Sequence, residues 1–182
     1  MLAWLLRSVA ASFATLVIII VSVTSALGLA GWAGIFLSTA TINVPTILMT
    51  LAVADSVHII ASAQFALRRG DSKLSALHYS IQRNLKPVLI TSVTTAIGFL
   101  TLNFSEVPIL RDLGNMTAVG VMLACLYSLV LLPVLLLFLP LKAGKASEDT
   151  HGAMDWLADK VIRHQRLLLP GLSIFILLCT AL

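Results

Sequence analysis

The apolar positions of this chain gather in long stretches that short polar segments separate. Crossing about 30 Å of hydrocarbon takes about 20 apolar residues in a helix, and an open backbone segment in lipid has no alternative to the helix. The pattern therefore predicts four membrane-spanning helices and the beginning of a fifth. Their approximate ranges are 9–31, 44–66, 87–104, 113–139 and 167–182.

Two polar segments between the spans carry a helical pattern of their own. Apolar side chains recur at helical spacing in residues 71–87, where Asp71 or Ser72 can cap a helix, and again in residues 154–166. Both are interpreted as short helices lying on the inner leaflet, with partner-docking helices as the alternative. Residues 142–152, "KAGKASEDTHG", are polar and rich in helix breakers, which predicts a flexible linker.

These segments predict three parts. Residues 1–140 form a transmembrane bundle, residues 141–166 form a cytoplasmic linker with an amphipathic helix, and residues 167–182 form a truncated next span. The short apolar stub before Arg7 and the sixteen or so apolar residues at the end both look like cut helices. The chain is therefore expected to be a fragment of something larger.

Composition agrees with a membrane location. Of the 182 residues, 59% are hydrophobic and only 11% are charged, and the mean hydropathy is +1.01. A soluble domain could not cover that much apolar surface with so few charges. The predicted fold class is an all-α, polytopic membrane helix bundle.

The basic residues show which side of the membrane each segment faces. Every Lys and Arg except Arg111 precedes the first span or lies between the second and third or the fourth and fifth spans. Those segments share one side of the membrane, and the positive-inside rule makes that side cytoplasmic. The net charge of +4 is therefore explained by topology, and nucleic acid is not expected as a partner.

Asp55 lies in the apolar stretch "LAVADSVHII", about ten residues from either end of its span. That position is about 15 Å deep, close to the midplane, where a carboxylate costs several kcal/mol unless something offsets it. Such a group can take a proton from one side and release it to the other. The alternative is an aspartate that only hydrogen-bonds a neighbouring helix.

Candidate partners of Asp55 lie on its own helix and on the third span. His58 is one turn further along the same face, where it could extend a proton path or simply pack as a neutral side chain. Thr91, Thr94 and Thr95 share one face of the third span with Gly98. We expect that face to lie against Asp55, although threonines are also ordinary contacts between membrane helices.

No enzyme is indicated by this sequence. It has no nucleotide-binding loop, metal-ligand cluster or nucleophilic triad, so no cofactor is expected. Cys125 and Cys179 both lie in apolar stretches and suggest neither a disulfide nor a metal site. The small residues Gly28, Gly31 and Gly34, and likewise Gly114, Thr117, Ala118 and Gly120, are interpreted as packing surfaces.

The order of motifs resembles the RND superfamily of exporters, and most of all its MMPL branch, which is related to the sterol-sensing domain. The resemblance rests on the aspartate span with "SVH", the stretch "PVLITSVTTAIGFLTLNFSEVPILRDLG", and the closing "VGVMLACLYSLVLLPVLLLF". It covers roughly residues 1–140. It implies that residues 1–6 end the second helix of the family, that the four full spans are its third to sixth helices, and that the chain comes from the N-terminal half.

The resemblance also implies a function. In this family the aspartate matched by Asp55 works with residues of the second half as a proton relay that drives export of lipids or other amphiphiles. Tyrosine often follows that aspartate, whereas this chain has Ser56, so His58 or Thr95 could take the partner's role. The implied partners are membrane lipids, a hydrophobic or amphiphilic substrate, the second half of the transporter and a homo-oligomer, all in a bacterial inner membrane.

Two other functions are compatible with the same helices. One is a sterol- or lipid-sensing membrane module that binds but does not pump, and the other is an accessory subunit of protein translocation similar to SecD and SecF. A sensor does not need an acid at the midplane, so Asp55 favours the pump. The substrate is not predicted, because the domain that would select it lies outside this chain.

Overall fold

The computed structural model describes residues 9–139 together with residues 160 and 163. The predicted linker and the predicted final span lie outside the described residues apart from those two positions. Within residues 9–139 the chain is helical and contains no strand. Four segments are long and apolar enough to cross a membrane: Val9–Trp32, Thr41–Arg68, Lys73–Phe104 and Pro108–Phe138. The predicted all-α, polytopic membrane bundle is confirmed.

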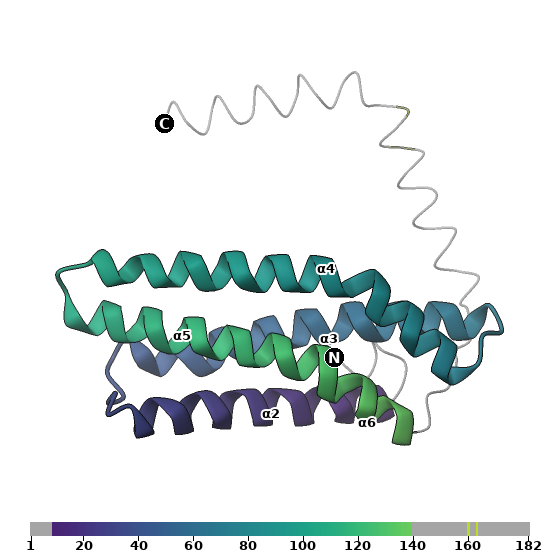
Figure 1. Cartoon of the computed structure of the whole chain (residues 1–182), viewed down its shortest axis with the longest axis horizontal. Helices are drawn as coiled ribbons and strands as arrows, with labels where there is room; N and C mark the ends of the chain where they lie inside the picture. Colours follow the sequence, from purple (N-terminus) through teal and green to yellow (C-terminus); the bar gives the residue numbers. More distant parts are fainter. Residues whose placement is uncertain (1–8, 140–159, 161–162, 164–182) are drawn as a thin grey trace. The chain divides into compact units, whose positions relative to one another are not determined.

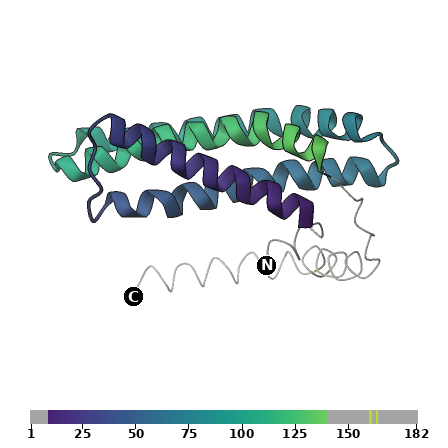
Figure 2. The same ribbon diagram turned by 90° about the horizontal axis from the view of Figure 1, so that it is seen from below.

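The long helices lie side by side, and successive ones run in opposite directions (Figure 1). Their bounds are α2 Val9–Trp32, α3 Val44–Arg68, α4 Lys73–Leu100, α5 Pro108–Leu126 and α6 Leu132–Phe138. Short 3-10 turns, η1 Thr41–Asn43 and η2 Thr101–Phe104, precede α3 and follow α4. Helix α2 crosses the others obliquely (Figure 2) and packs on α3 and α5, whereas α4 packs on α3 and α5 from another side.

The third span differs from its prediction. Residues 71–87 do not form a separate helix on the membrane surface but are the first half of α4, which runs unbroken from Lys73 to Leu100. Ser72 caps it as expected, because its hydroxyl accepts from the backbone N–H of Ser75 at 3.4 Å. Pro87 lies inside the helix, where it removes one backbone hydrogen bond, and α4 bends along its length (Figure 1) without breaking.

The fourth span contains a π-helical turn, η3 Tyr127–Leu131, between α5 and α6. Pro133 follows it at the beginning of α6. Since proline lacks an N–H and clashes with the carbonyl four residues earlier, regular α-helical pairing cannot continue through this turn. The hydroxyls of Tyr127 and Ser25 form a hydrogen bond of 3.1 Å, which ties the π turn to α2.

Close packing depends on small residues, but on only one of the two predicted sets. Gly114, Thr117, Ala118 and Gly120 are all buried in α5, as expected. A Cβ at Gly120 would lie 2.6 Å from Leu48 Cδ1 of α3. The prediction for Gly28, Gly31 and Gly34 is wrong within the described part, because all three are exposed and a Cβ at each would meet nothing within 4 Å.

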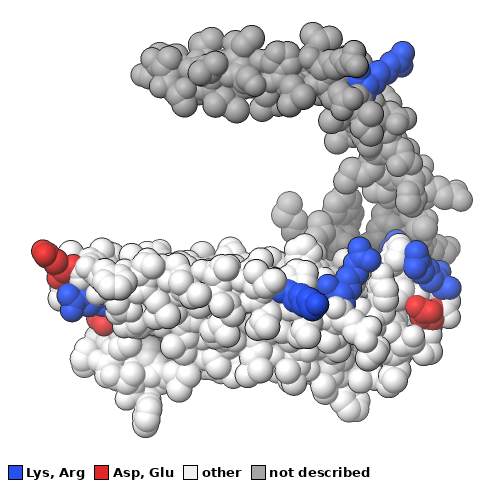
Figure 3. Space-filling view, turned by 45° about the horizontal axis from the view of Figure 1, so that its top comes forward, with Lys and Arg blue, Asp and Glu red and all other residues white. Residues whose placement is uncertain are grey.

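The outer surface is suited to lipid. Many large apolar side chains are exposed along the helices, among them Ile20, Ile90, Ile97 and Val130. On the face that Figure 3 shows, charged side chains gather at one end of the bundle and over the half nearer the other end, and an uncharged stretch lies between the two groups. Arg68, Arg69 and Lys73 mark the end that the positive-inside rule makes cytoplasmic.

Candidate functional site: an acid between three helices

Asp55 lies near the middle of α3. At 1.5 Å per residue it is about 17 Å from Val44 and about 20 Å from Arg68, the two ends of that helix. The side chain is half-buried. A carboxyl group at this depth is far from bulk water on both sides of a bilayer.

Three helices contribute polar groups around this position. Ser92 of α4 lies near Cys125 of α5, and Asp55 of α3 lies close enough to interact electrostatically with Cys125. Both Ser92 and Cys125 are buried. An acid, a hydroxyl and a thiol therefore meet in the middle of the bundle. The sequence showed only that Cys125 lies in an apolar stretch, and that pattern gave no sign of these neighbours.

His58 lies one helical turn from Asp55, towards the cytoplasmic end, and interacts with it electrostatically. Its imidazole is exposed on the surface of the bundle. Among residues 9–139, no side chain donates a hydrogen bond to the Asp55 carboxylate. His58 lies near Asp55 because both are on one face of α3, and its part in a proton path or in holding Asp55 by charge stays a prediction.

The expected position of the threonine face is wrong. Thr91, Thr94 and Gly98 are exposed, and Thr95 is half-buried. Each threonine hydroxyl donates to a carbonyl of α4 itself, at 3.0 Å for Thr91 to Pro87, 2.8 Å for Thr94 to Ile90 and 2.7 Å for Thr95 to Thr91. These hydroxyls are engaged within their own helix. Whether they act in a relay stays a prediction.

The face of α4 that packs inward is a neighbouring one. Its buried residues repeat every four positions: Ser80, Asn84, Val88, Ser92 and Ala96. Ser80 donates to the carbonyl of Ile59 at 2.5 Å, and Asn84 Nδ2 donates to Ser62 Oγ at 2.9 Å. A polar seam thus joins α3 to α4 between the level of Asp55 and the cytoplasmic end. The repeat of small and polar residues was present in the sequence and could have identified Ser92.

Ser56, which follows Asp55, is fully buried, and its hydroxyl has no hydrogen-bond partner within the described part of the chain. Leaving a buried hydroxyl unpaired costs about 1–3 kcal/mol. Since Ser56 has no exposed surface, a tyrosine at this position would require the neighbouring helices to move apart. The serine is therefore suited to close packing of α3, and it contributes no partner to Asp55.

The sequence of this chain is similar to those of known membrane proteins. The family model described as the MMPL family matches residues 1–164. The chain belongs to the MMPL family. This MMPL chain is also 27% identical over 109 residues to the membrane protein MJ1562 of Methanocaldococcus jannaschii. That match covers 60% of the present chain and 28% of the relative, so the chain spans only a part of the relative's length. No solved structure matches it.

The arrangement in this MMPL chain is that of a multi-pass membrane protein with one acid at mid-depth. Within the described residues, no three His, Cys, Asp or Glu side chains gather as metal ligands. Asp55 can hold or release a proton, and the Ser92 hydroxyl and Cys125 thiol give its surroundings some polarity. The chemistry available at this site is therefore proton binding and hydrogen bonding.

Proposed function

We propose that this chain is part of a proton-motive-force-driven permease of the RND type, which exports lipids or other hydrophobic or amphiphilic molecules across a bacterial inner membrane. The observation that carries the proposal is the position of Asp55 at mid-depth in α3, with His58 one helical turn away. Membership of the MMPL family supports a transporter. Ionisable groups at the centre of a bilayer are expensive and are in general functional.

In the proposed mechanism Asp55 alternates between a charged and a neutral form. The charged carboxylate of Asp55 requires polar surroundings, which Ser92 and Cys125 supply. The neutral carboxyl group tolerates contact with apolar side chains. Moving one charge through the membrane potential is worth about 2.3 kcal/mol per 100 mV, which is enough to shift a bundle between two conformations of similar energy. Each proton taken from outside therefore biases the packing of α3 against its neighbours.

The polar seam between α3 and α4 would carry that bias towards the cytoplasm. Ser80 and Asn84 hold α4 against α3 by hydrogen bonds at the cytoplasmic half of the pair. A shift of α3 would therefore move α4 with it, as a unit. The second half of the transporter would supply further relay residues, and hydrophobic substrate would reach the protein from the lipid.

The test is the substitution Asp55→Asn in the full-length transporter, with Asp71→Asn as the matched control. Asparagine keeps the shape of the side chain but cannot titrate, so we expect normal membrane insertion and loss of proton-coupled export of a fluorescent amphiphile. Asp71 is exposed next to the beginning of α4, and its replacement should leave export unchanged. Thr95→Ala should have a smaller effect than Asp55→Asn.

Two results would contradict the proposal. Export at the wild-type rate by Asp55→Asn under the same proton gradient would exclude Asp55 as the proton carrier, and would favour a lipid-sensing or protein-translocation role. Failure of the same variant to accumulate in the membrane would mean that Asp55 mainly holds helices together.

A further inference from the structure

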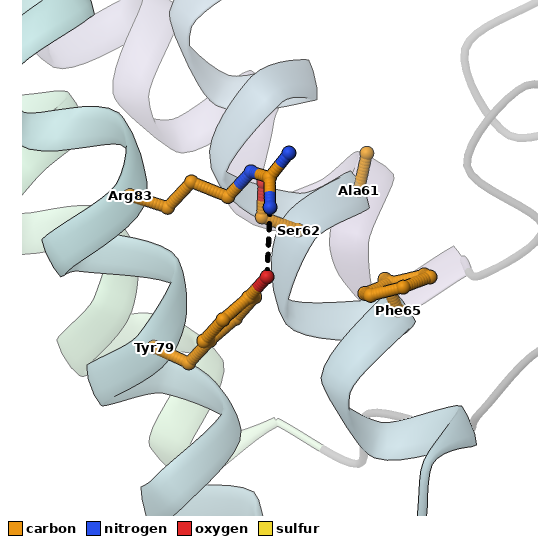
Figure 4. A pocket seen from close by; sticks show the side chains of 5 residues that line it. All are labelled: Ala61, Ser62, Phe65, Tyr79 and Arg83. Carbon is orange, nitrogen blue, oxygen red and sulfur yellow. Dashed lines mark hydrogen bonds between the residues drawn. The ribbon is translucent and has the colours of Figure 1, made fainter.

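A second polar site lies between α3 and α4, at the cytoplasmic end of the bundle and away from Asp55. It is a pocket of about 260 Å³ lined by Ala61, Ser62, Phe65, Tyr79 and Arg83 (Figure 4). Since a water molecule occupies about 30 Å³ of liquid, the pocket has room for a group the size of about nine waters. That suits a lipid headgroup better than a whole amphiphile, because pockets that enclose drug-sized ligands measure about 300–1,000 Å³.

Several hydrogen-bond donors in this pocket are not used in bonds within the described part of the protein. Arg83 Nη1 donates to the Tyr79 hydroxyl at 2.8 Å, as Figure 4 shows, so the phenol oxygen acts as acceptor there and its own O–H remains available. Ser62 Oγ likewise accepts from Asn84 Nδ2 at 2.9 Å. The guanidinium has five N–H groups, of which one is used in this contact. Arginine, phenol and serine can therefore all donate to the same occupant.

The charge of Arg83 is not neutralised within the bundle. Among residues 9–139 no carboxylate pairs with it, and its side-chain partner is the phenol of Tyr79. A second guanidinium lies nearby, because Arg69 is stacked 4.4 Å from the centre of the Phe65 ring that lines the pocket. Positive charge combined with free donors selects an anion, and a planar guanidinium matches the oxygens of a phosphate.

The depth of the pocket indicates where that anion comes from. Phe65 lies three residues before the end of α3 at Arg68, and Arg83 lies four residues before the apolar stretch of α4 that begins at Pro87, so the pocket opens in the layer where the cytoplasmic halves of the two helices approach the membrane surface. Headgroup phosphates occupy that layer. Tyr79 is an aromatic residue of the kind that gathers at this boundary. Two larger hollows, of about 430 and 480 Å³, are lined mostly by apolar side chains and contain no arginine or lysine.

We propose that this pocket binds the phosphate of an anionic phospholipid of the cytoplasmic leaflet. Arg83 and the hydroxyls of Tyr79 and Ser62 contact the phosphate oxygens, and the acyl chains descend along the exposed apolar surface of α3 and α4. Basic pockets between transmembrane helices on this side are suited to lipid headgroups. Because the two helices that hold Asp55 and Ser92 also form the pocket, the bound lipid stabilises their pairing. The inference does not rest on the proposed transport function.

The test is lipid binding by the delipidated protein in detergent, counted by native mass spectrometry during titration with phosphatidylglycerol or phosphatidylcholine. We expect one phosphatidylglycerol to bind about tenfold more tightly than phosphatidylcholine, and Arg83→Gln to abolish that preference. Arg68→Gln is the matched control, because it removes the same charge from the exposed end of α3 without lining the pocket. It should keep the preference.

An additional variant and a competition experiment complete the test of lipid binding. Tyr79→Phe removes one hydroxyl and should weaken phosphatidylglycerol binding by about threefold, which keeps the test available if Arg83→Gln does not fold, as judged by circular dichroism. Soluble glycerol phosphate at millimolar concentration should not displace the lipid. Displacement would identify a site for free phosphates and overturn the lipid assignment. Equal loss in Arg83→Gln and Arg68→Gln would overturn it too, because only general surface charge would then matter.

Discussion

The contact between α4 and α5 allows a sharp test of the packing, because it depends on the absence of a side chain at Gly114. A Cβ added there would overlap the backbone carbonyl oxygen of Phe99 and lie 3.0 Å from the Cβ of Leu102. Neither atom is the end of a flexible side chain, so α4 and α5 would have to separate. We therefore expect Gly114→Ala to destabilise the bundle.

The magnitude follows from two opposing effects. Overpacking typically costs about 1–3 kcal/mol, and a clash with backbone belongs at the upper end of that range. Alanine is favoured over glycine inside a helix by about 1 kcal/mol, which offsets part of the loss. The net expectation for Gly114→Ala is a decrease of about 2 kcal/mol in the free energy of unfolding.

Gly98→Ala is the matched control, because it makes the same chemical change near the same end of α4. A Cβ at Gly98 would meet nothing within 4 Å, so only the helix preference acts, and the stability should stay equal or rise by up to about 1 kcal/mol. Unfolding in mixed micelles of increasing SDS content, followed by circular dichroism, measures both variants. Equal stability of Gly114→Ala and Gly98→Ala would refute the close approach of α4 and α5.

Two further predictions concern topology and the polar seam. In a background without Cys125 and Cys179, a cysteine at Glu106 should react in intact cells with a membrane-impermeant thiol reagent, whereas one at Asp71 should react only after lysis, because the basic segments are cytoplasmic. Equal reaction at both positions would contradict the topology. Asn84→Ala removes the donor to Ser62 and should lower the free energy of unfolding by about 0.6–1.7 kcal/mol in the SDS assay, with exposed Gln82→Ala as an unchanged control.

Within the described residues, the sequence by itself determined that there are four spans, and it determined the approximate limits of the first, second and fourth. Length and apolar composition are local properties, and a bilayer requires a helix wherever about 20 apolar residues follow one another. The prediction of 9–31 for the first span therefore agrees closely with Val9–Trp32. The same local information placed Asp55 near the middle of its helix and placed the basic residues on one side, since both depend only on position along the chain.

The neighbours of Asp55 on other helices were decided by tertiary structure alone. Helix α4 carries two adjacent polar faces, one with Thr91, Thr94 and Thr95 and the other with Asn84 and Ser92, and both repeat with a helical period. In a soluble helix the hydrophobic effect would separate an inner from an outer face, but lipid is as apolar as leucine and does not make that distinction. Threonine hydroxyls can also donate to the carbonyls of their own helix, so their presence does not require a partner.

Steric fit, rather than polarity, determines which polar face of α4 packs inward. Small or hydrogen-bonding residues of α4 occur every four positions and are buried against α3 and α5, which brings Ser92 close to Cys125. The same reasoning separates Gly114, which α4 approaches closely, from Gly28, which contacts nothing. Composition identifies residues that permit close approach, whereas the partner helix determines which of them are used, because packing is a property of two surfaces together.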